Sequence, residues 1–323
     1  MSLLKSTLNL LADGKFHSEK DLSQFLGLPN SVVTETLQQL LQPAINLEKL
    51  EGKGYRIPGG LELLNEKLIL NELAEAYYLL NQLEILTTIG STNTYLLEKK
   101  GILKTIAVFS EQQTAGRGQF NRTWMSSTFG KNIALSILWH LPKKINTLTG
   151  LSLVIGVAVV QALEEYGLNG LKLKWPNDVI YLEKKLAGVL IEASSSNSAA
   201  FNPVVVGIGL NLYHPIGVSN NINQAITDIY SIQKLPPQRN RIAGLLLKNI
   251  LTTLLEFQTK GLTPFIEKWQ KFDYLINRVV DIQKDNTFVK GVVRGINSQG
   301  QLSIEIAGKI QHFVGGEIQI NLN

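Results

Sequence analysis

The spacing of apolar residues changes twice along this 323-residue chain, and each pattern requires a different kind of core. Residues 1–61 repeat leucines at helical spacing, residues 62–272 alternate helical runs with short apolar strands, and residues 273–323 contain only short strand-like runs. A single hydrophobic core rarely organises more than about 250–300 residues. The sequence therefore predicts an α+β multidomain protein, with domains at 1–61, 62–272 and 273–323.

The first domain is predicted to contain three short helices and a β-hairpin. Residues 3–11 repeat leucine at helical spacing. Ser18 and Asp21 have the spacing of a capping box, and Pro29-Asn30-Ser31 opens a third helix. Gly52-Lys53-Gly54 is the expected turn of the hairpin. These elements predict a winged helix-turn-helix, with a small helical interaction domain as the alternative.

The middle domain is predicted to be α/β with a mixed sheet, because adjacent strands are close enough to pair as hairpins. Glu183-Lys184 is the clearest of these turns. The expected helices cover residues 64–83, 148–165, 241–258 and 264–271. The expected strands cover residues 106–109, 133–139, 171–174, 179–182, 186–192 and 204–212.

Five short strands within about fifty residues predict a small SH3-like β-barrel for the third domain. They are expected at residues 279–282, 289–293, 302–306, 310–314 and 318–320. The start of the chain lacks the pattern of a secretory signal. The most apolar run, residues 151–163, is too short to span a bilayer. We therefore expect a cytoplasmic protein with no membrane partner.

Charge and composition narrow the chemistry. The net charge is +5, and residues 1–60 and 272–323 are each balanced, so the positive excess lies in the middle domain. Such an excess suits anionic small molecules or an acidic protein partner and is too weak to indicate nucleic acid by itself. With no cysteine, the chain has no disulfide framework, Cys-ligated zinc, iron–sulfur cluster or Cys nucleophile.

Several common motifs are incomplete or absent from the sequence. The stretch Gly207-Ile208-Gly209-Leu210-Asn211 has two glycines of a dinucleotide fingerprint, but Leu212 stands where the third is needed. No GxxxxGK[ST] or GxSxG sequence occurs, and the four histidines lack metal-binding spacing. The chemistry must therefore come from other polar clusters.

Two polar clusters lie in the first half of the middle domain. Ser91-Thr92-Asn93 offers three small polar side chains to a neutral ligand, or simply caps a helix. Arg117 stands between Gly116 and Gly118, where the backbone can curl around a ligand while the guanidinium reaches a carboxylate or phosphate. A solvated surface loop is the alternative for this second cluster.

The sharpest motif is Lys174-Trp175-Pro176-Asn177-Asp178, which places polar side chains at the tip of a strand. A surface ion pair is the simpler interpretation of its lysine and aspartate. Lys185-Leu186-Ala187-Gly188 opens the next strand, with small residues that let another group approach the backbone. Two glycines in Gly207-Ile208-Gly209-Leu210-Asn211 allow a planar ring or backbone to pack there.

In order and spacing, these five clusters resemble those of the biotin protein ligases. The predicted winged helix and C-terminal barrel resemble the long, bifunctional form, which is also the biotin operon repressor. The central fold is then of the biotin/lipoate ligase type. Lipoate ligases share it, but usually have a Ser-Gly-Gly-Gly type loop where this chain has Ala115-Gly116-Arg117-Gly118. A lipoate–protein ligase, or a DNA-binding biotin sensor with little ligase role, are the alternatives.

The resemblance implies a two-step reaction with ATP and Mg²⁺, in which biotin forms biotinyl-adenylate and is transferred to a lysine of a carrier protein. The implied partners are biotin, ATP, the biotin carboxyl carrier protein of acetyl-CoA carboxylase, operator DNA, and a second copy in an adenylate-linked homodimer. For DNA, the candidate contacts are Ser31, Thr34, Gln38 and Lys53.

Site roles carry over by position. The resemblance implies that Lys185 and Arg117 are catalytic. It implies a biotin site of Ser91, Thr92, Asn93, Gln113, Arg117, Gly118, Gln119 and Lys185. It implies nucleotide contacts from Arg122, Trp124, Lys174, Asn177, Asp178 and Asn211, with Mg²⁺ on Asp178.

Two departures from the family pattern matter. Many relatives have an arginine where this chain has Gln119, so we expect weaker retention of the adenylate. The segment between Leu212 and Leu235 keeps Asn223-Gln224 but has no tryptophan, which leaves Ile226 or Ile229 as the apolar cover for adenine.

Overall fold

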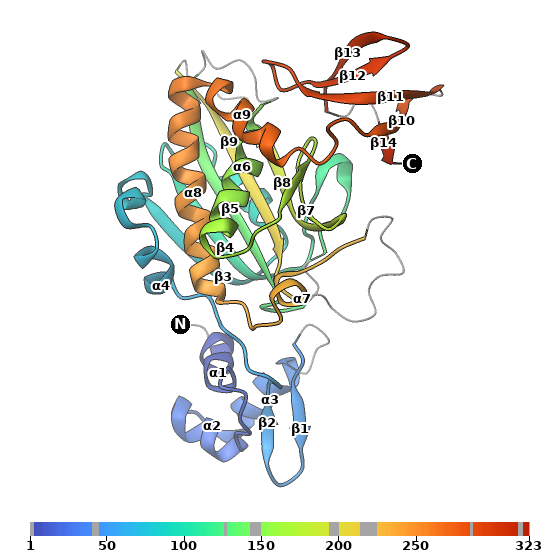
Figure 1. The fold of residues 1–323 in the computed structure, drawn as a ribbon. Coiled ribbons are helices and arrows are strands. Elements are labelled where there is room, and N and C mark those ends of the chain that lie inside the picture. The colour runs from blue at the N-terminus through green and yellow to red at the C-terminus, as the bar shows by residue number, and fades with distance from the viewer. Residues whose placement is uncertain are drawn as a thin grey trace.

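The computed structural model describes residues 3–40, 45–125, 128–142, 150–193, 200–213, 225–284, 287–315 and 319–322. The N-terminal helices and hairpin lie at one end of the molecule, a large sheet with its helices lies in the middle, and a smaller sheet lies at the far end (Figure 1). The three patterns of the sequence thus correspond to three successive structural regions.

The N-terminal region has the helices and hairpin that its leucine pattern predicts. Its elements are α1 (Leu3–Leu11), α2 (Glu19–Leu26), α3 (Asn30–Leu40), β1 (Glu48–Leu50) and β2 (Gly54–Arg56). The capping box is confirmed, because the Asp21 amide donates to Ser18 Oγ over 3.1 Å and the Ser18 amide donates to Asp21 Oδ2 over 3.2 Å. Gly27 ends α2 at a φ of 65°, which favours glycine.

The middle region is built on a seven-stranded mixed sheet in the order β3-β4-β5-β9-β8-β7-β6. Strands β3 and β4 are parallel, and every other neighbouring pair is antiparallel, which confirms the predicted mixed sheet. The strands are β3 (Gln82–Ile89), β4 (Ile106–Gln113), β5 (Asn132–Pro142), β6 (Lys172–Lys174), β7 (Asp178–Tyr181), β8 (Lys184–Ala193) and β9 (Phe201–Asn211).

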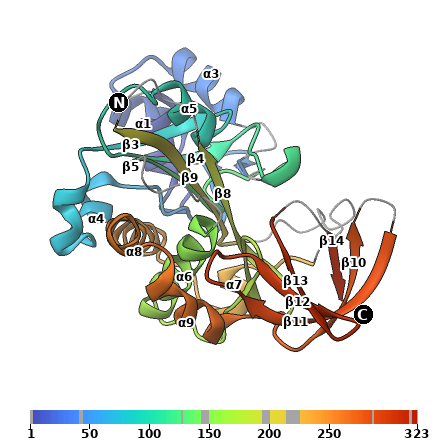
Figure 2. The same ribbon diagram turned by 90° about the horizontal axis from the view of Figure 1, so that it is seen from above.

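Helices cover the two faces of this sheet unequally. Helices α6 (Leu151–Glu165) and α8 (Arg239–Lys260) lie on one face with α9 (Thr263–Phe272) beside them, whereas the short α5 (Thr92–Glu98) lies on the other (Figure 2). Alternate residues of β4 face opposite ways: Phe109 packs in the main core with α6 and α8, and Val108 packs with Leu96 of α5. Much of the α5 face is therefore left for a site.

Helix α6 is buried along most of its length, as its apolar run predicts. No helix in the described ranges combines the length and apolar character that a bilayer crossing requires.

The prediction of a single helix over residues 64–83 is wrong. That stretch contains α4 (Glu66–Asn71), the 3₁₀ helix η1 (Ala74–Leu79) and the first residues of strand β3. Ala74 has a φ of 46°, which interrupts helical geometry between α4 and η1. Leucine-rich runs of this length are compatible with helix or strand by periodicity alone, and pairing with β4 decides the outcome here.

The C-terminal region is an antiparallel sheet in the order β13-β12-β11-β10-β14. Its strands are β10 (Val279–Lys284), β11 (Thr287–Ile296), β12 (Leu302–Ile306), β13 (Lys309–Phe313) and β14 (Gln319–Leu322). Within the described residues no pairing joins the edge strands β13 and β14, so closure into a barrel stays a prediction.

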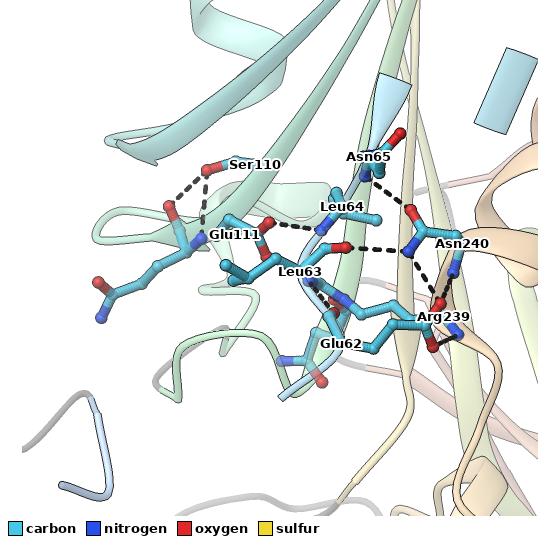
Figure 3. A network of polar contacts seen from close by, with 10 residues as sticks. Glu62, Leu63, Leu64, Asn65, Ser110, Glu111, Arg239 and Asn240 are labelled. Atoms are coloured by element: carbon cyan, nitrogen blue, oxygen red, sulfur yellow. Dashed lines mark hydrogen bonds and ion pairs between the residues drawn. The ribbon is translucent and has the colours of Figure 1, made fainter. Parts of the chain in front are cut away.

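A buried ion pair between α8 and β4 anchors the segment that follows the N-terminal region (Figure 3). Arg239, at the start of α8, is 2 % exposed and pairs with the Glu111 carboxylate at the end of β4. Its guanidinium also donates to the Asn132 carbonyl over 3.0 Å and to the Glu62 carbonyl over 3.2 Å. The other Glu111 oxygen accepts from the Leu64 amide over 2.7 Å.

The same junction supplies the missing cap of α8, because Gln238 at the N-cap position makes no side-chain cap bond. The Glu62 carboxylate accepts from the Arg239 amide over 2.6 Å and from the Asn240 amide over 3.1 Å. A carboxylate in this position also stabilises the positive end of the helix dipole. Residues 62–64 are therefore fastened to α8, β4 and β5 together.

Truncating Arg239→Ala should lower the free energy of unfolding by about 3–5 kcal/mol, because Glu111 would stay buried without its cation. Urea unfolding followed by circular dichroism measures the change. Lys248→Ala is the control: Lys248 lies on the same helix in a partly exposed pair with Glu165, and its loss should cost about 1 kcal/mol or less. Equal losses in the two variants would contradict the role given to Arg239.

Candidate active site

The floor of the candidate site is a row of small residues on the α5 face of the sheet. Neighbouring strands align Asp178, Gly188, Gly209 and Ala134, in that order, across β7, β8, β9 and β5. Side chains that are paired across strands point to the same face. Small residues therefore leave a shallow space beside the Asp178 carboxylate.

The indole of Trp124 fills part of this space. A Cβ added to Gly209 would lie 2.2 Å from Trp124 Cε2, and one added to Gly188 would lie 3.2 Å from Trp124 Cζ3. The ring therefore rests directly on the two glycines. Of the two glycines in Gly207–Asn211 where a planar ring or backbone was expected, Gly209 contacts a ring, and that ring belongs to the chain itself.

The N-terminus of α5 forms one wall from the Ser91-Thr92-Asn93 cluster. All three residues are buried, and Ser91 is the N-cap, so the capping interpretation is correct for this residue. Gln113 Oε1 accepts from the Thr92 amide over 2.8 Å and from its hydroxyl over 3.0 Å. A Cβ on Gly207 would lie 2.2 Å from Asn93 Oδ1, so this glycine is needed for α5 to approach β9.

Arg117 reaches this wall from the loop of residues 116–124, called here the glycine loop. Its Nη2 lies 2.7 Å from Glu192 Oε1 on β8, and its Nη1 donates to Thr94 Oγ1 over 3.2 Å. The loop is tight, since the Gly118 amide donates to the Arg122 carbonyl over 2.7 Å and the Trp124 amide donates to the Gly116 carbonyl over 2.9 Å. Arg117 is exposed, as the surface-loop interpretation expects, but these contacts hold its side chain beside β8 and α5.

Lys185 lies on the opposite side of the small-residue row. Its Nζ is 2.7 Å from Asp178 Oδ1 and 5.6 Å from the centre of the Trp124 ring. The pair is largely buried, which distinguishes it from an ordinary surface ion pair. A cation–π contact adds to the attraction that holds the ammonium in place.

The Lys174–Asp178 motif divides into structural and site residues. Trp175 is buried, and its Nε1 donates to the Gly300 carbonyl of the C-terminal region over 3.2 Å. Asn177 Nδ2 donates to the Val189 carbonyl over 2.8 Å, which fixes the strand tip. Lys174 pairs in register with Asp178 and therefore shares the face of the site.

Burial lowers the pKa of Lys174 below its ordinary value, because removal of water disfavours the ammonium form. The Asp178 carboxylate opposes this shift, while Lys185 and Arg122 add to it. An arriving anion would relieve the repulsion among these cations. The cluster thus favours a ligand with several negative charges.

The remaining predicted residues lie around this centre. Asn211 aligns with Asn132 at the start of β5 and donates through Nδ2 to the Thr227 carbonyl over 3.1 Å. Gln119 is half-buried and Arg122 is exposed, both in the glycine loop.

The structure reduces the number of candidate residues for covering the adenine. Asn223-Gln224 lies outside the described residues. Ile229 is wholly buried in the main core, so it is not a candidate cover. Ile226 is half-buried and forms a bridge with Lys185.

The sequence interpretation assigned no role to three polar residues of the site, which are Glu192, Thr94 and Ser136. Ser136 Oγ lies 2.5 Å from Asn93 Oδ1 and 2.7 Å from Thr92 Oγ1. A serine within the apolar run 133–139 of β5 was the available signal, because such a residue is buried and needs a partner. Glu192 had the same signal at the end of β8.

The residues predicted for DNA lie far from this centre, in the N-terminal region. Ser31, Gln38 and Lys53 are exposed. Thr34 donates to Glu19 Oε2 over 2.9 Å, so its hydroxyl is engaged within the region. The acidic partner also places negative charge beside α3.

Comparisons with known proteins agree with this geometry. The model of the Biotin/lipoate A/B protein ligase family matches residues 86–211. The bifunctional ligase/repressor BirA of Escherichia coli K12 is 35 % identical over 312 residues, which are 96 % of this chain and 95 % of that protein. BirA of Bacillus subtilis is 25 % identical, over 96 % of this chain and 95 % of that one. The solved biotin protein ligase from Aquifex aeolicus, in complex with biotin and ATP, matches with a TM-score of 0.64 and 28 % identity, over 75 % of this chain and all of that one.

Substituting Gly209→Ala should displace Trp124, because the new methyl would lie inside the contact distance of the indole. We expect tryptophan emission to move to longer wavelength, and overpacking to cost about 1–3 kcal/mol of stability. Gly101→Ala is the control, since its Cβ meets nothing within 4 Å. An emission change that persists in a Trp124→Phe background would contradict this assignment.

Proposed function

Because this chain belongs to the biotin/lipoate A/B protein ligase family, we propose that it is an ATP-dependent biotin–protein ligase. The enzyme joins biotin to ATP as biotinyl-5′-adenylate and transfers biotin to a lysine of a carrier protein. The observation that carries the proposal is the position of Lys185, between Asp178 and the Trp124 ring, on the sheet face that also holds Arg117.

The first step brings like charges together. The biotin carboxylate attacks the α-phosphorus of ATP, the bond to the bridging oxygen breaks, and pyrophosphate leaves. Two unit charges ~4 Å apart repel by about 4 kcal/mol at an effective dielectric of ~20, so the site must supply cations and donors. Lys185, Arg117, Lys174 and Arg122 provide that charge without any protein nucleophile.

Each wall of the site then has a role. Ser91, Thr92, Asn93, Gln113 and the Arg117–Gln119 loop hold biotin, and Lys185 contacts both the biotin carboxylate and the α-phosphate. Arg122, Trp124, Lys174, Asn177, Asp178 and Asn211 face the nucleotide. In the second step the carrier lysine attacks the acyl carbon, and AMP leaves.

Mg²⁺ fits the residues in a limited way. Among the described residues, no group of three His, Asp or Glu side chains forms a metal cage. Mg²⁺ at nucleotide sites commonly needs only one or two carboxylates besides phosphates and water, and Asp178 offers one. Asp178 would hold the ion, which would neutralise charge on the phosphates.

The carrier is proposed to be the biotin carboxyl carrier protein of acetyl-CoA carboxylase. Lipoate remains the competing acid, and the Arg117 loop argues against it because lipoate ligases usually have a Ser-Gly-Gly-Gly type loop. ATP–pyrophosphate exchange with biotin or lipoate as the acid distinguishes the two functions.

A regulatory function is proposed for the N-terminal region as a winged helix-turn-helix that binds operator DNA. Its support is the order of α1, α2, α3 and the β1–β2 hairpin, together with full-length similarity to ligase/repressors. Leu61 and Leu63 pack with the N-terminal core, which also contains Phe129, and Leu64 packs with the main core, so the change of core falls two residues after the proposed boundary at residues 61 and 62. A second boundary near 272 and 273, a closed C-terminal barrel and a cytoplasmic location stay predictions.

Replacing Lys185→Ala should slow adenylate formation about 10²–10³-fold, since one cation acting on transition-state charge contributes ~3–4 kcal/mol. Biotin-dependent ATP–pyrophosphate exchange measures this rate. Lys184→Ala, at the exposed neighbouring position, is the control and should keep the wild-type rate. A Lys185→Ala variant with more than half the wild-type rate would refute the assignment.

Operator binding should be weak without ligand, because residues 1–60 carry no net charge and α3 contains no Lys or Arg. Non-specific DNA affinity comes mostly from such cations. We expect a specific complex only for an adenylate-linked homodimer, which doubles the contacts. Salt titration of operator binding by the full chain, with and without biotin and ATP, measures this. Tight binding by the ligand-free monomer at physiological salt would overturn the prediction.

A further inference from the structure

We infer that Glu192 is a positioning residue for biotin, acting through Arg117 rather than through contact with the substrate. This inference rests on the proposed function. Glu192 lies on β8, two strand positions beyond Leu190, which aligns with Gly207 on the face of the site. Its carboxylate connects the glycine loop to the wall formed by α5.

Both carboxylate oxygens are used, one for each side. Oε1 lies 2.7 Å from Nη2 of Arg117, and Oε2 accepts from Nδ2 of Asn93 over 2.9 Å. The Glu192 side chain is only 18 % exposed, whereas that of Arg117 is 42 % exposed. The carboxylate is thus better fixed than the guanidinium it holds.

The Asn93 side of this connection is rigid for separate reasons. Asn93 is 4 % exposed, its Oδ1 lies 2.5 Å from Ser136 Oγ on β5, and its amide packs directly on Gly207 of β9. The contacts with β5 and β9 fix the orientation of the Asn93 side-chain amide, so its Nδ2 points in one direction. The Glu192 carboxylate therefore has a set orientation before Arg117 meets it.

Arg117 gains a defined position from this contact. A guanidinium has five N–H donors. Within the described part of the chain, Glu192 takes one of them and Thr94 takes another, so others can meet the carboxylate of biotin. Preorganisation of this kind lowers the cost of ordering the loop when the ligand binds.

Electrostatic repulsion alone predicts that Glu192 weakens biotin binding, whereas the inference predicts that Glu192 strengthens it. The direction of the change in biotin binding therefore tests the inference. A carboxylate near an anion-binding site repels the incoming biotin carboxylate. Removing its charge would then strengthen binding. If positioning dominates, removing the charge weakens binding.

The critical variant is Glu192→Gln. A glutamine side chain offers one acceptor and one donor group, but Arg117 and Asn93 Nδ2 both donate, so one of the two contacts must break. Hydrogen bonds to charged groups are strong enough for such a loss to change binding about tenfold or more. We expect the KM for biotin in ATP–pyrophosphate exchange to rise about tenfold, with kcat changed much less.

Glu84→Gln is the matched control. The Glu84 side chain, on β3, is 17 % exposed, lies 2.6 Å from Nζ of Lys99, the C-cap of α5, and accepts from the hydroxyl of Tyr95 on α5 over 2.6 Å. This variant removes a strand carboxylate of nearly equal burial that also contacts α5, away from the site. Its KM for biotin should equal that of the wild type. Glu192→Asp keeps both acceptors on a shorter side chain and should give an intermediate KM.

A double-mutant comparison tests the route through Arg117. Adding Glu192→Gln to Arg117→Ala should raise the KM no further, because the residue to be positioned is gone. A KM for biotin in Glu192→Gln that is unchanged or lower than in the wild type would overturn the inference, as would an additive rise in the double variant. Absence of biotin-dependent exchange in the wild type would instead refute the proposed function, and the inference with it.

Discussion

The pair of Arg239 and Glu111 is the interaction on which the arrangement of the regions depends. It is nearly inaccessible to water, and breaking a pair of this kind leaves a buried charge without compensation. The same guanidinium holds the carbonyl of Asn132, where β5 begins, and the carbonyl of Glu62, where the chain leaves the N-terminal region. One side chain therefore relates the position of the N-terminal region to the strands that form the floor of the site.

The site lies on the face of the sheet that the helices leave partly uncovered. Helices α6 and α8 pack with one face in the main core, while the short α5 covers only part of the other. Small residues at Gly188, Gly207 and Gly209 then let the Trp124 ring and the Asn93 amide approach the strands closely. A larger residue at Gly207 would displace the Asn93 amide, and one at Gly209 would displace the Trp124 ring. The glycines of this chain thus act through their lack of volume.

Interactions between residues close in the sequence could be predicted from it, whereas contacts between residues far apart in the sequence could not. The capping box of Ser18 and Asp21 depends on residues three positions apart, so it was readable directly. The role of Trp175 depends on Gly300, and that of Glu192 on Arg117, neither of which is near in sequence. Strand β3 was missed because Gln82–Ile89 lies at a sheet edge and has no clear alternation of buried and exposed residues. Recognition of the family supplied what spacing alone left open in the site.

Two cations of the site are each paired with a carboxylate. Arg117 is paired with Glu192, and Lys185 is paired with Asp178, on opposite sides of the small-residue row. Burial is the main cause of the lowered pKa of Lys174, and the nearby cations Lys185 and Arg122 add to it, so cations gathered in this site repel one another. The two carboxylates therefore offset the repulsion between the cations and fix where they point. A ligand with several negative charges then adds the compensation that the paired carboxylates leave incomplete.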